Sequence, residues 1–253
     1  MSHPATTTRA LYDHHATGWV RTQPTILSDY TARPRVLERA GNVKDAELLD
    51  LGCGEGYLSR ALAERGARSI LAIDQSGAMI QSAIEQNRND GWNINYQRDS
   101  ATTWHPPVET FDLAIAIFLL NYLTVDESVE SLTRARLGLK PGGKLILTVP
   151  HPALPWLRRQ EPPFYFAKPT RGYSESRDVQ LEGRIWARHG ESVPVRCRHK
   201  TFDDLMGVIR RAGFVGPIHF EELGVTPEHL ALDPDFFGPL KGTPLHMLIE
   251  VSR

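Results

Sequence analysis

Apolar and polar residues follow strand-like and helix-like patterns in turn between residues 47 and 150. The apolar run at 48–51 predicts a buried strand, and Leu58, Ala61 and Leu62 then fall on one face of a helix. The same patterns predict further strands at 69–73, 94–98, 111–117 and 144–149, with helices at 77–88 and around Val129, Leu132 and Ala135. Uninterrupted alternation of this kind is typical of the α/β class, in which helices cover both faces of a parallel sheet.

The two ends of the chain continue this pattern with fewer signals. Apolar residues are spread thinly through 1–46 and indicate two short helices, the second running from Pro34 to Ala40 and ending at Gly41. We interpret this segment as a helical lid. Near the other end, Thr201 is a candidate N-cap for a helix over 202–212, and strands are predicted at 215–223 and 244–251.

Residues 151–198 break the alternation. Five prolines lie between 151 and 173 and exclude long helices there, while 181–187 and 193–198 read as the two strands of a β-hairpin. Because this aromatic-rich insertion follows a strand at the ligand-binding edge of such a sheet, we interpret it as a substrate cover within a single domain of 1–253. A dimer interface or additional core remains an alternative.

A glycine-rich turn follows the first predicted strand. Gly52, Gly54 and Gly56 alternate there, and glycine lets a ligand approach the backbone closely. The helix that follows directs its N–H groups toward the same place. Asp74 ends the second strand about twenty residues later, where nucleotide-binding βαβ units hold a ribose. These positions predict a nucleotide-like ligand.

The spacing distinguishes this turn from a dinucleotide fingerprint, since Tyr57 stands where the third glycine of that motif is required. Asp50-x-Gly-x-Gly-x-Gly resembles motif I of the class I S-adenosylmethionine-dependent methyltransferases of the small-molecule type. Asp99 resembles motif II of that family, and matching positions extend over about 48–150, with Tyr30-x-x-Arg33-Pro34 preceding them. Further resemblances are the Phe-Asp-Leu strand at 111–113 and a tight Leu-Lys-Pro-Gly-Gly turn at 139–143.

The resemblance implies a fold, a cofactor and a set of residues that bind it. The fold is a doubly wound, seven-stranded, mostly parallel Rossmann-like sheet whose last strand is antiparallel. The cofactor is S-adenosylmethionine, which leaves as S-adenosylhomocysteine. The implied cofactor-binding residues are Tyr30, Arg33, Asp50, Gly52, Cys53, Gly54, Gly56, Asp74, Gln75, Met79, Asp99, Ser100, Ala101 and Phe118.

A methyl acceptor would contact the lid and the cover. We expect its contacts from Trp19, Tyr122, Trp156, Tyr165, Trp186 and His199. A neutral amine needs no base, whereas a hydroxyl or carbon acid benefits from one. His151 directly follows the fifth strand and is the predicted catalytic base, with His199 as the second choice.

Composition narrows the function further. The net charge of −1, with 23% charged residues, gives no broad electrostatic attraction to nucleic acid or to an anionic membrane. Two cysteines form no disulfide framework or Cys-x-x-Cys pair, and no histidine spacing indicates a metal site. The N-terminus lacks the apolar core of a secretory signal, so we expect a cytoplasmic protein.

These features predict an enzyme that transfers a methyl group from S-adenosylmethionine to N, O or C of a small, aromatic or prenyl-like metabolite. Two alternatives are a non-catalytic regulator that binds S-adenosylmethionine and a methyltransferase that acts on a peptide or protein. The acceptor, the atom that is methylated and the oligomeric state are left open by the sequence.

Overall fold

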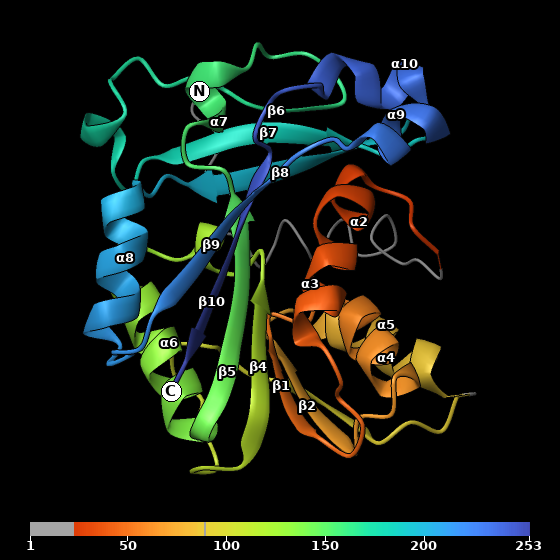
Figure 1. Cartoon of the computed structure of the whole chain (residues 1–253), viewed down its shortest axis with the longest axis vertical. Helices are drawn as coiled ribbons and strands as arrows, with labels where there is room; N and C mark the ends of the chain where they lie inside the picture. The colour runs from red at the N-terminus through yellow and green to blue at the C-terminus, as the bar shows by residue number, and fades with distance from the viewer. Residues whose placement is uncertain (1–22, 89) are drawn as a thin grey trace.

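The computed structural model describes residues 23–88 and 90–253, and its centre is a seven-stranded sheet (Figure 1). The strand order is β3-β2-β1-β4-β5-β10-β9. The first five of these strands are parallel, and β10 is antiparallel to both of its neighbours, which confirms the predicted fold. The strands are β1 (Glu47–Leu51), β2 (Ser69–Asp74), β3 (Ile94–Arg98), β4 (Phe111–Ile117), β5 (Leu139–Pro150), β9 (Ile218–Leu223) and β10 (His246–Ser252).

Helices cover both faces of this sheet, as Figure 1 shows. The helices α3 (Arg33–Ala40), α4 (Tyr57–Glu64) and α5 (Gly77–Asn87) lie on one side, and α6 (Val125–Gly138) and α8 (Phe202–Arg211) on the other. Along β1, Leu48 packs into the core on the α4 side, while Leu49 and Leu51 pack into the core on the α6 side. Both faces of the strand are therefore buried, which explains its nearly continuous apolar sequence.

Side-chain caps define where the helices on the α6 side begin. The Thr201 hydroxyl accepts a hydrogen bond from the Asp204 backbone N–H, which confirms the predicted start of α8. Thr124 and Glu127 form the equivalent capping box at α6. Since a capping residue contributes about 1 kcal/mol to helix stability, these polar residues help to fix the segments that lead into the sheet edge.

A second, three-stranded antiparallel sheet lies across the carboxyl ends of the parallel strands (Figure 1). It contains β6 (Phe164–Phe166), β7 (Gln180–Trp186) and β8 (Ser192–Arg198), and it follows the short helix α7 (Leu154–Leu157). The pairing of β7 with β8 confirms the predicted hairpin. Strand β6 was not expected, because three aromatic residues flanked by prolines give too short a pattern to identify. We call this three-stranded sheet the cover.

Two local predictions were wrong. The fifth strand begins at Leu139 instead of Lys144, because the expected tight turn is a bulge within the strand: the β4–β5 register shifts there, and Gly142 has a φ of +78°. Between β9 and β10, where no clear helix was expected, the chain forms α9 (Pro227–Leu232) and α10 (Pro234–Phe237). Each begins with a proline and is capped by the preceding Thr226 or Asp233, so it is stabilised locally despite its shortness.

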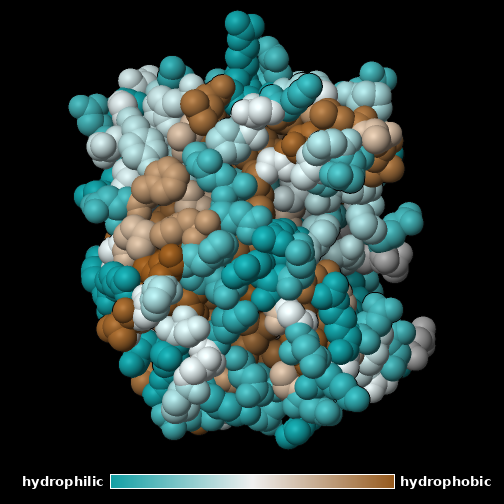
Figure 2. Space-filling model, viewed as in Figure 1, coloured by the Kyte–Doolittle hydropathy of each residue, from teal (hydrophilic) through white to brown (hydrophobic). Residues whose placement is uncertain are grey.

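The remaining elements are short. They are α2 (Leu27–Thr31), η1 (Leu120–Tyr122), η2 (Ser174–Ser176) and η3 (Gly238–Leu240). The face seen in Figure 1 is mainly hydrophilic, with hydrophobic side chains in separate small areas (Figure 2). Within the described residues, no helix combines the length and the apolar character that crossing a bilayer requires.

Candidate active site

A cavity of about 360 Å³ lies between the carboxyl ends of the parallel strands and the cover. We call its two parts the sheet side and the cover side. The sheet side is lined by Asp50, Gly52, Cys53, Gly54, Asp74, Gln75, Ser76, Met79, Asp99, Ser100, Ala101 and Phe118. The cover side is lined by Asn121, Tyr122, Phe164, Phe166, Ile185, Val195, Arg196 and His246.

The glycine turn has different requirements at its three glycines. All three have positive φ values, of 73°, 56° and 79° at Gly52, Gly54 and Gly56. A Cβ atom at Gly56 would lie 2.4 Å from the Tyr96 hydroxyl oxygen, so packing requires glycine there. A Cβ at Gly54 would meet no protein atom within 4 Å. Because Gly54 also lines the cavity, its open side is where a ligand can approach the backbone.

Carboxylates mark the ends of neighbouring strands on the sheet side. Asp74 accepts hydrogen bonds from the backbone N–H groups of Gly54, at 3.0 Å, and Ser76, at 2.8 Å. Asp99, directly after β3, accepts from the Ser100 N–H at 2.7 Å, and its own N–H donates to the Asp74 carbonyl at 3.1 Å. These bonds hold the β1, β2 and β3 ends together around the cavity.

Asp50 is a buried acid at the same edge. Its carboxyl accepts a hydrogen bond from the Ser59 hydroxyl at 2.6 Å. Burial raises the pKa of Asp50 to about 7, and the neighbouring Asp74 carboxylate adds to the rise while the Arg33 guanidinium opposes it. A ligand with a positive charge beside Asp50 would favour its ionised form.

Arg33 projects from the start of α3 into the cavity. Its guanidinium donates to the Asp29 carboxylate at 2.7 Å and to the Ser28 hydroxyl at 2.6 Å. It also lies 5.6 Å from the centre of the Phe118 ring. Phe118 itself has a φ of +57°, at the point where the chain leaves β4. Arg33 is therefore held in place by the buried Asp29 before any ligand enters.

The structure brings most of the predicted cofactor-binding residues together and leaves two of them aside. Tyr30 does not line the cavity: its ring packs edge-on against Phe237, and the Arg188 guanidinium lies 5.5 Å from its centre. Gly56 is covered by Tyr96. The others line the cavity and are Arg33, Asp50, Gly52, Cys53, Gly54, Asp74, Gln75, Met79, Asp99, Ser100, Ala101 and Phe118.

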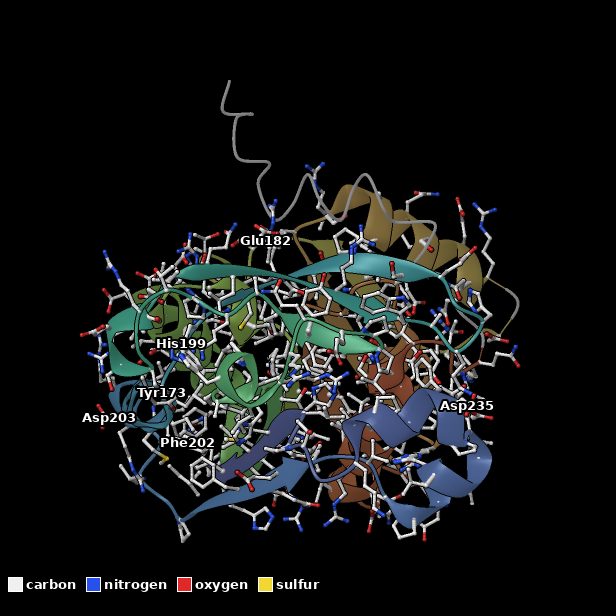
Figure 3. All side chains as sticks on the ribbon, turned by 90° about the horizontal axis from the view of Figure 1, so that it is seen from above. Tyr173, Glu182, His199, Phe202, Asp203 and Asp235 are labelled. Atoms are coloured by element: carbon white, nitrogen blue, oxygen red, sulfur yellow. The ribbon has the colours of Figure 1, made fainter. Side chains whose placement is uncertain are left out.

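His151 and His199 line a different, much smaller cavity of about 20 Å³. The His151 Nε2 lies 2.8 Å from a Glu222 carboxylate oxygen, and the His199 Nε2 lies 2.9 Å from the Tyr173 carbonyl. Burial lowers the pKa of His199. Tyr173 and His199 lie together at the end of the molecule where α8 begins, far from Asp235 (Figure 3). The Trp156 ring packs here too, 4.8 Å from His199.

The strands of the cover present alternate residues to its two faces. Phe164 and Phe166 of β6 are buried and line the cavity, as does Ile185 of β7. Tyr165 and Trp186 do not line it, and their rings lie 5.9 Å apart. Period-two alternation along β6 would have separated Phe164 and Phe166 from Tyr165, had this strand been predicted. Of the expected acceptor contacts, Tyr122 lines the main cavity, and Trp19 lies outside the described residues.

Sequence reasoning did not single out four polar residues of the main cavity. Asn121 and Glu127 come from the segment after β4, Arg196 from β8 and His246 from the first position of β10. No motif marks them. The placement of His246 follows only from the antiparallel pairing of β10 with β5, which sets it opposite Pro150 at the sheet edge.

Comparisons with known proteins agree with this architecture. Residues 48–143 match the family described as "Methyltransferase domain". A curated ubiquinone biosynthesis O-methyltransferase from Coxiella burnetii is 31% identical over 46% of this chain and 48% of its own length. An N-demethylindolmycin N-methyltransferase from Streptomyces griseus is 30% identical over 42% of this chain and 44% of its own. The chain thus spans about half the length of the curated relatives it matches.

Solved structures match over more of the chain. An S-adenosylmethionine-dependent methyltransferase from Mesorhizobium loti is 25% identical, with a TM-score of 0.66, over 88% of this chain and 98% of its own. A structure from Listeria monocytogenes, described as a putative enzyme of the same kind, has the same TM-score of 0.66 at 21% identity, over 87% of this chain and 96% of its own. The second similarity supports the fold alone.

Proposed function

Because this chain belongs to the class I S-adenosylmethionine-dependent methyltransferases, we propose that it transfers a methyl group from S-adenosylmethionine to a small acceptor. The observation that carries the proposal is that one cavity joins the glycine turn and strand-end carboxylates to an apolar cover. The acceptor is a small molecule with an apolar, aromatic or prenyl-like body, because the apolar Phe164, Phe166 and Ile185 line the cover side. The names of the relatives from Coxiella burnetii and Streptomyces griseus support a small-molecule acceptor.

The residues on the sheet side fit this cofactor on two observations. The open space over Gly54 admits a ligand against the backbone, next to the strand-end carboxylates that the resemblance assigns to the ribose and the adenine, Asp74 and Asp99. Burial raises the pKa of Asp50 to about 7, and a cation beside it would stabilise its ionised form. S-adenosylmethionine has a positive charge at both its sulfonium and its amino group.

When bound, S-adenosylmethionine supplies a methyl carbon whose bond to sulfur breaks as its bond to the acceptor forms, with the electron pair staying on sulfur. The chain's own residues contribute position and exclusion of water. Gly54 and Asp74 would hold the cofactor at the strand ends, and Phe164, Phe166 and Ile185 would place the acceptor against it. Positioning of this kind can supply much of the rate enhancement of a displacement between two bound partners.

Proton removal depends on the acceptor. A neutral amine attacks with its lone pair, and the methylated product can lose its proton to water after release. A hydroxyl acceptor benefits from a base, for which His151 stays a prediction. Its imidazole is held by Glu222 on the wall of the smaller cavity, so a role in proton removal requires a path between the two cavities.

Transfer of label from S-adenosylmethionine with an isotopic methyl group tests the proposal. The full chain is incubated separately with a small-molecule extract and with a protein extract of the source organism. We expect label in the small-molecule fraction, and none with the Asp74→Ala variant as control. Label in protein supports the peptide or protein alternative instead. Cofactor binding without transfer to either extract supports the regulator.

A further inference from the structure

His246 lies where the sheet side and the cover side of the cavity meet. It is 1% exposed, and its ring packs between Phe118 at the end of β4 and Phe164 of the cover, with centroids 5.1 and 5.6 Å away. Both of these aromatic residues line the cavity, as His246 does. The imidazole therefore lies between the residues that flank the cofactor position and those that would hold an acceptor.

The hydrogen bond to Thr31 indicates which ring nitrogen of His246 carries hydrogen. The Thr31 hydroxyl donates its single hydrogen to the Leu27 carbonyl at 3.0 Å. The His246 Nε2 lies 3.0 Å from the same hydroxyl oxygen, which can then only accept. This arrangement favours Nε2 as the donor, which leaves Nδ1 of the neutral ring with a lone pair and no hydrogen.

The ring is also kept uncharged. Burial lowers the pKa of His246 to about 3, and the positive charge of Arg33 acts in the same direction. Among the described residues, the buried Nδ1 has no hydrogen-bond partner. A buried acceptor without a donor destabilises the folded chain, and a ligand that donates a hydrogen bond to it would remove this cost.

Asn121 supplies a second atom of the same kind. Its amide nitrogen faces the Arg196 carbonyl at 3.4 Å, so the amide oxygen is directed elsewhere. That oxygen is buried and likewise has no partner among the residues the structure describes. Asn121 is 4% exposed and lines the main cavity. The cover side, which Tyr122 and Arg196 also line, thus contains two buried hydrogen-bond acceptors that have no partner among the described residues.

We propose that His246 and Asn121 form the polar part of the acceptor subsite and that both accept hydrogen bonds from the methyl acceptor. His246 orients the N–H or O–H of the nucleophilic atom, and Asn121 reads a second polar hydrogen. This inference rests on the proposed function and names its substrate class: an uncharged phenol, aromatic amine or N–H heterocycle.

Two other classes of acceptor fit poorly. A carboxylate or phosphate offers no hydrogen to either atom, so it would leave both acceptors unsatisfied even though Arg33 and Arg196 line the same cavity. A protonated amine offers hydrogens but has no lone pair for attack. Both considerations select neutral donors.

Nuclear magnetic resonance on the full chain with isotope-labelled histidine nitrogens tests the proposal without relying on activity. The His246 signals are assigned by their absence from the spectrum of His246→Asn. In the unliganded protein we expect hydrogen on Nε2 and none on Nδ1. Phenol, aniline or indole, added with saturating S-adenosylhomocysteine, should shift the Nδ1 signal toward that of a hydrogen-bonded nitrogen, and toluene should not. Hydrogen on Nδ1, or no shift with any of the three donors, overturns the inference.

Two variants separate the roles of the two nitrogens. His246→Gln can still reach Thr31 but loses the acceptor at the Nδ1 position, whereas His246→Asn keeps an acceptor there and loses Thr31. We expect His246→Gln to weaken binding of the strongest of the three probes about three- to tenfold, the cost of one neutral hydrogen bond, and His246→Asn to restore most of it. Equal weakening by both variants contradicts the inference.

Calorimetric binding of S-adenosylhomocysteine distinguishes a failure of the proposed function from a failure of the acceptor subsite. Both variants should bind it within about twofold of the wild type, since neither alters the glycine turn or the strand-end carboxylates. If the wild type itself fails to bind, the proposed function falls and this inference with it. If it binds and the donor probes leave the Nδ1 signal unmoved, the inference alone falls.

Discussion

The two sides of the cavity are built in different ways. The sheet side consists of backbone and short acidic side chains at the ends of adjacent parallel strands, with Asp74 bonded to two backbone N–H groups. The cover side consists of larger side chains from segments far apart in the sequence, such as Asn121, Phe166 and His246. The sheet side is therefore fixed by the fold itself, whereas the cover side combines the insertion at 151–198 with residues of η1 and β10.

This difference has a consequence for function. A site formed by strand ends can bind the same cofactor in many proteins, because any chain with this topology places those ends together. A site formed by an insertion can change its acceptor without disturbing the sheet. Changes on the sheet side should alter cofactor binding and the ionisation of the site, and changes on the cover side should alter acceptor binding.

The largest effect is expected on the free energy of unfolding when Asp50, the buried acid of the sheet side, is replaced. The pKa of Asp50 is about 7 in the folded chain, whereas an unfolded chain has the ordinary value near 4. The folded state therefore holds this proton more tightly. Stability from this group is present in full below about pH 4 and is lost as the pH rises through about 7. Without ligand, Asp50→Asn should be more stable than wild type by up to about 4 kcal/mol at about pH 8, and equally stable near pH 4.

Urea unfolding at both pH values measures this difference. Asp235→Asn, at an exposed position of α10 (Figure 3), is the matched control and should stay within about 0.5 kcal/mol of the wild type at either pH. An Asp50→Asn chain that is less stable than wild type at the higher pH would show that the buried carboxylate is satisfied in some other way.

Cofactor affinity should show the next largest contrast. Asp74→Ala removes the carboxylate assigned to the ribose and leaves the Gly54 and Ser76 N–H groups without their acceptor. Since hydrogen bonds to a charged group contribute about 1.5–3 kcal/mol each, we expect S-adenosylhomocysteine to bind at least about 100-fold more weakly. Phe166→Leu, on the cover side, should change this affinity less than about threefold. Calorimetry measures the affinity of both variants for S-adenosylhomocysteine. A larger loss in Phe166→Leu than in Asp74→Ala would contradict the division of the cavity into a cofactor side and an acceptor side.

The two faces of the cover give the smallest contrast. Phe166 lines the cavity and the adjacent Tyr165 does not. Replacing Phe166 by leucine removes apolar contact worth about 1 kcal/mol, so KM for the acceptor identified by isotope transfer should rise about fivefold. Tyr165→Leu should leave KM within about twofold. Steady-state kinetics measures both, and equal effects would mean that the acceptor does not contact the inner face.

The sequence predicted the sheet side better than the cover side for a physical reason. Gly52, Asp74 and Asp99 are placed by local patterns, since each stands at the end of a strand whose period is visible in the sequence. The order of the strands and the antiparallel last strand came from the family resemblance. The bulge at Gly142 was missed because a Pro-Gly-Gly sequence is compatible with either a turn or a bulge.

The polar residues of the cover side could not be predicted in this way. His246 reaches the cavity because β10 pairs with β5 from the opposite direction, and Asn121 because the chain turns at Phe118 with a positive φ. Both are consequences of tertiary structure. The position of His151 along the chain was predicted, since it follows β5 as expected. The direction of its side chain could not be predicted, and it lines the smaller cavity.

A crystal structure of the full chain with S-adenosylhomocysteine tests the central claim most directly. The account predicts the nucleoside over Gly54, its ribose hydroxyls within hydrogen-bond distance of the Asp74 carboxylate, and its sulfur facing the cover. A ligand bound elsewhere, or a ribose held without Asp74, would contradict it.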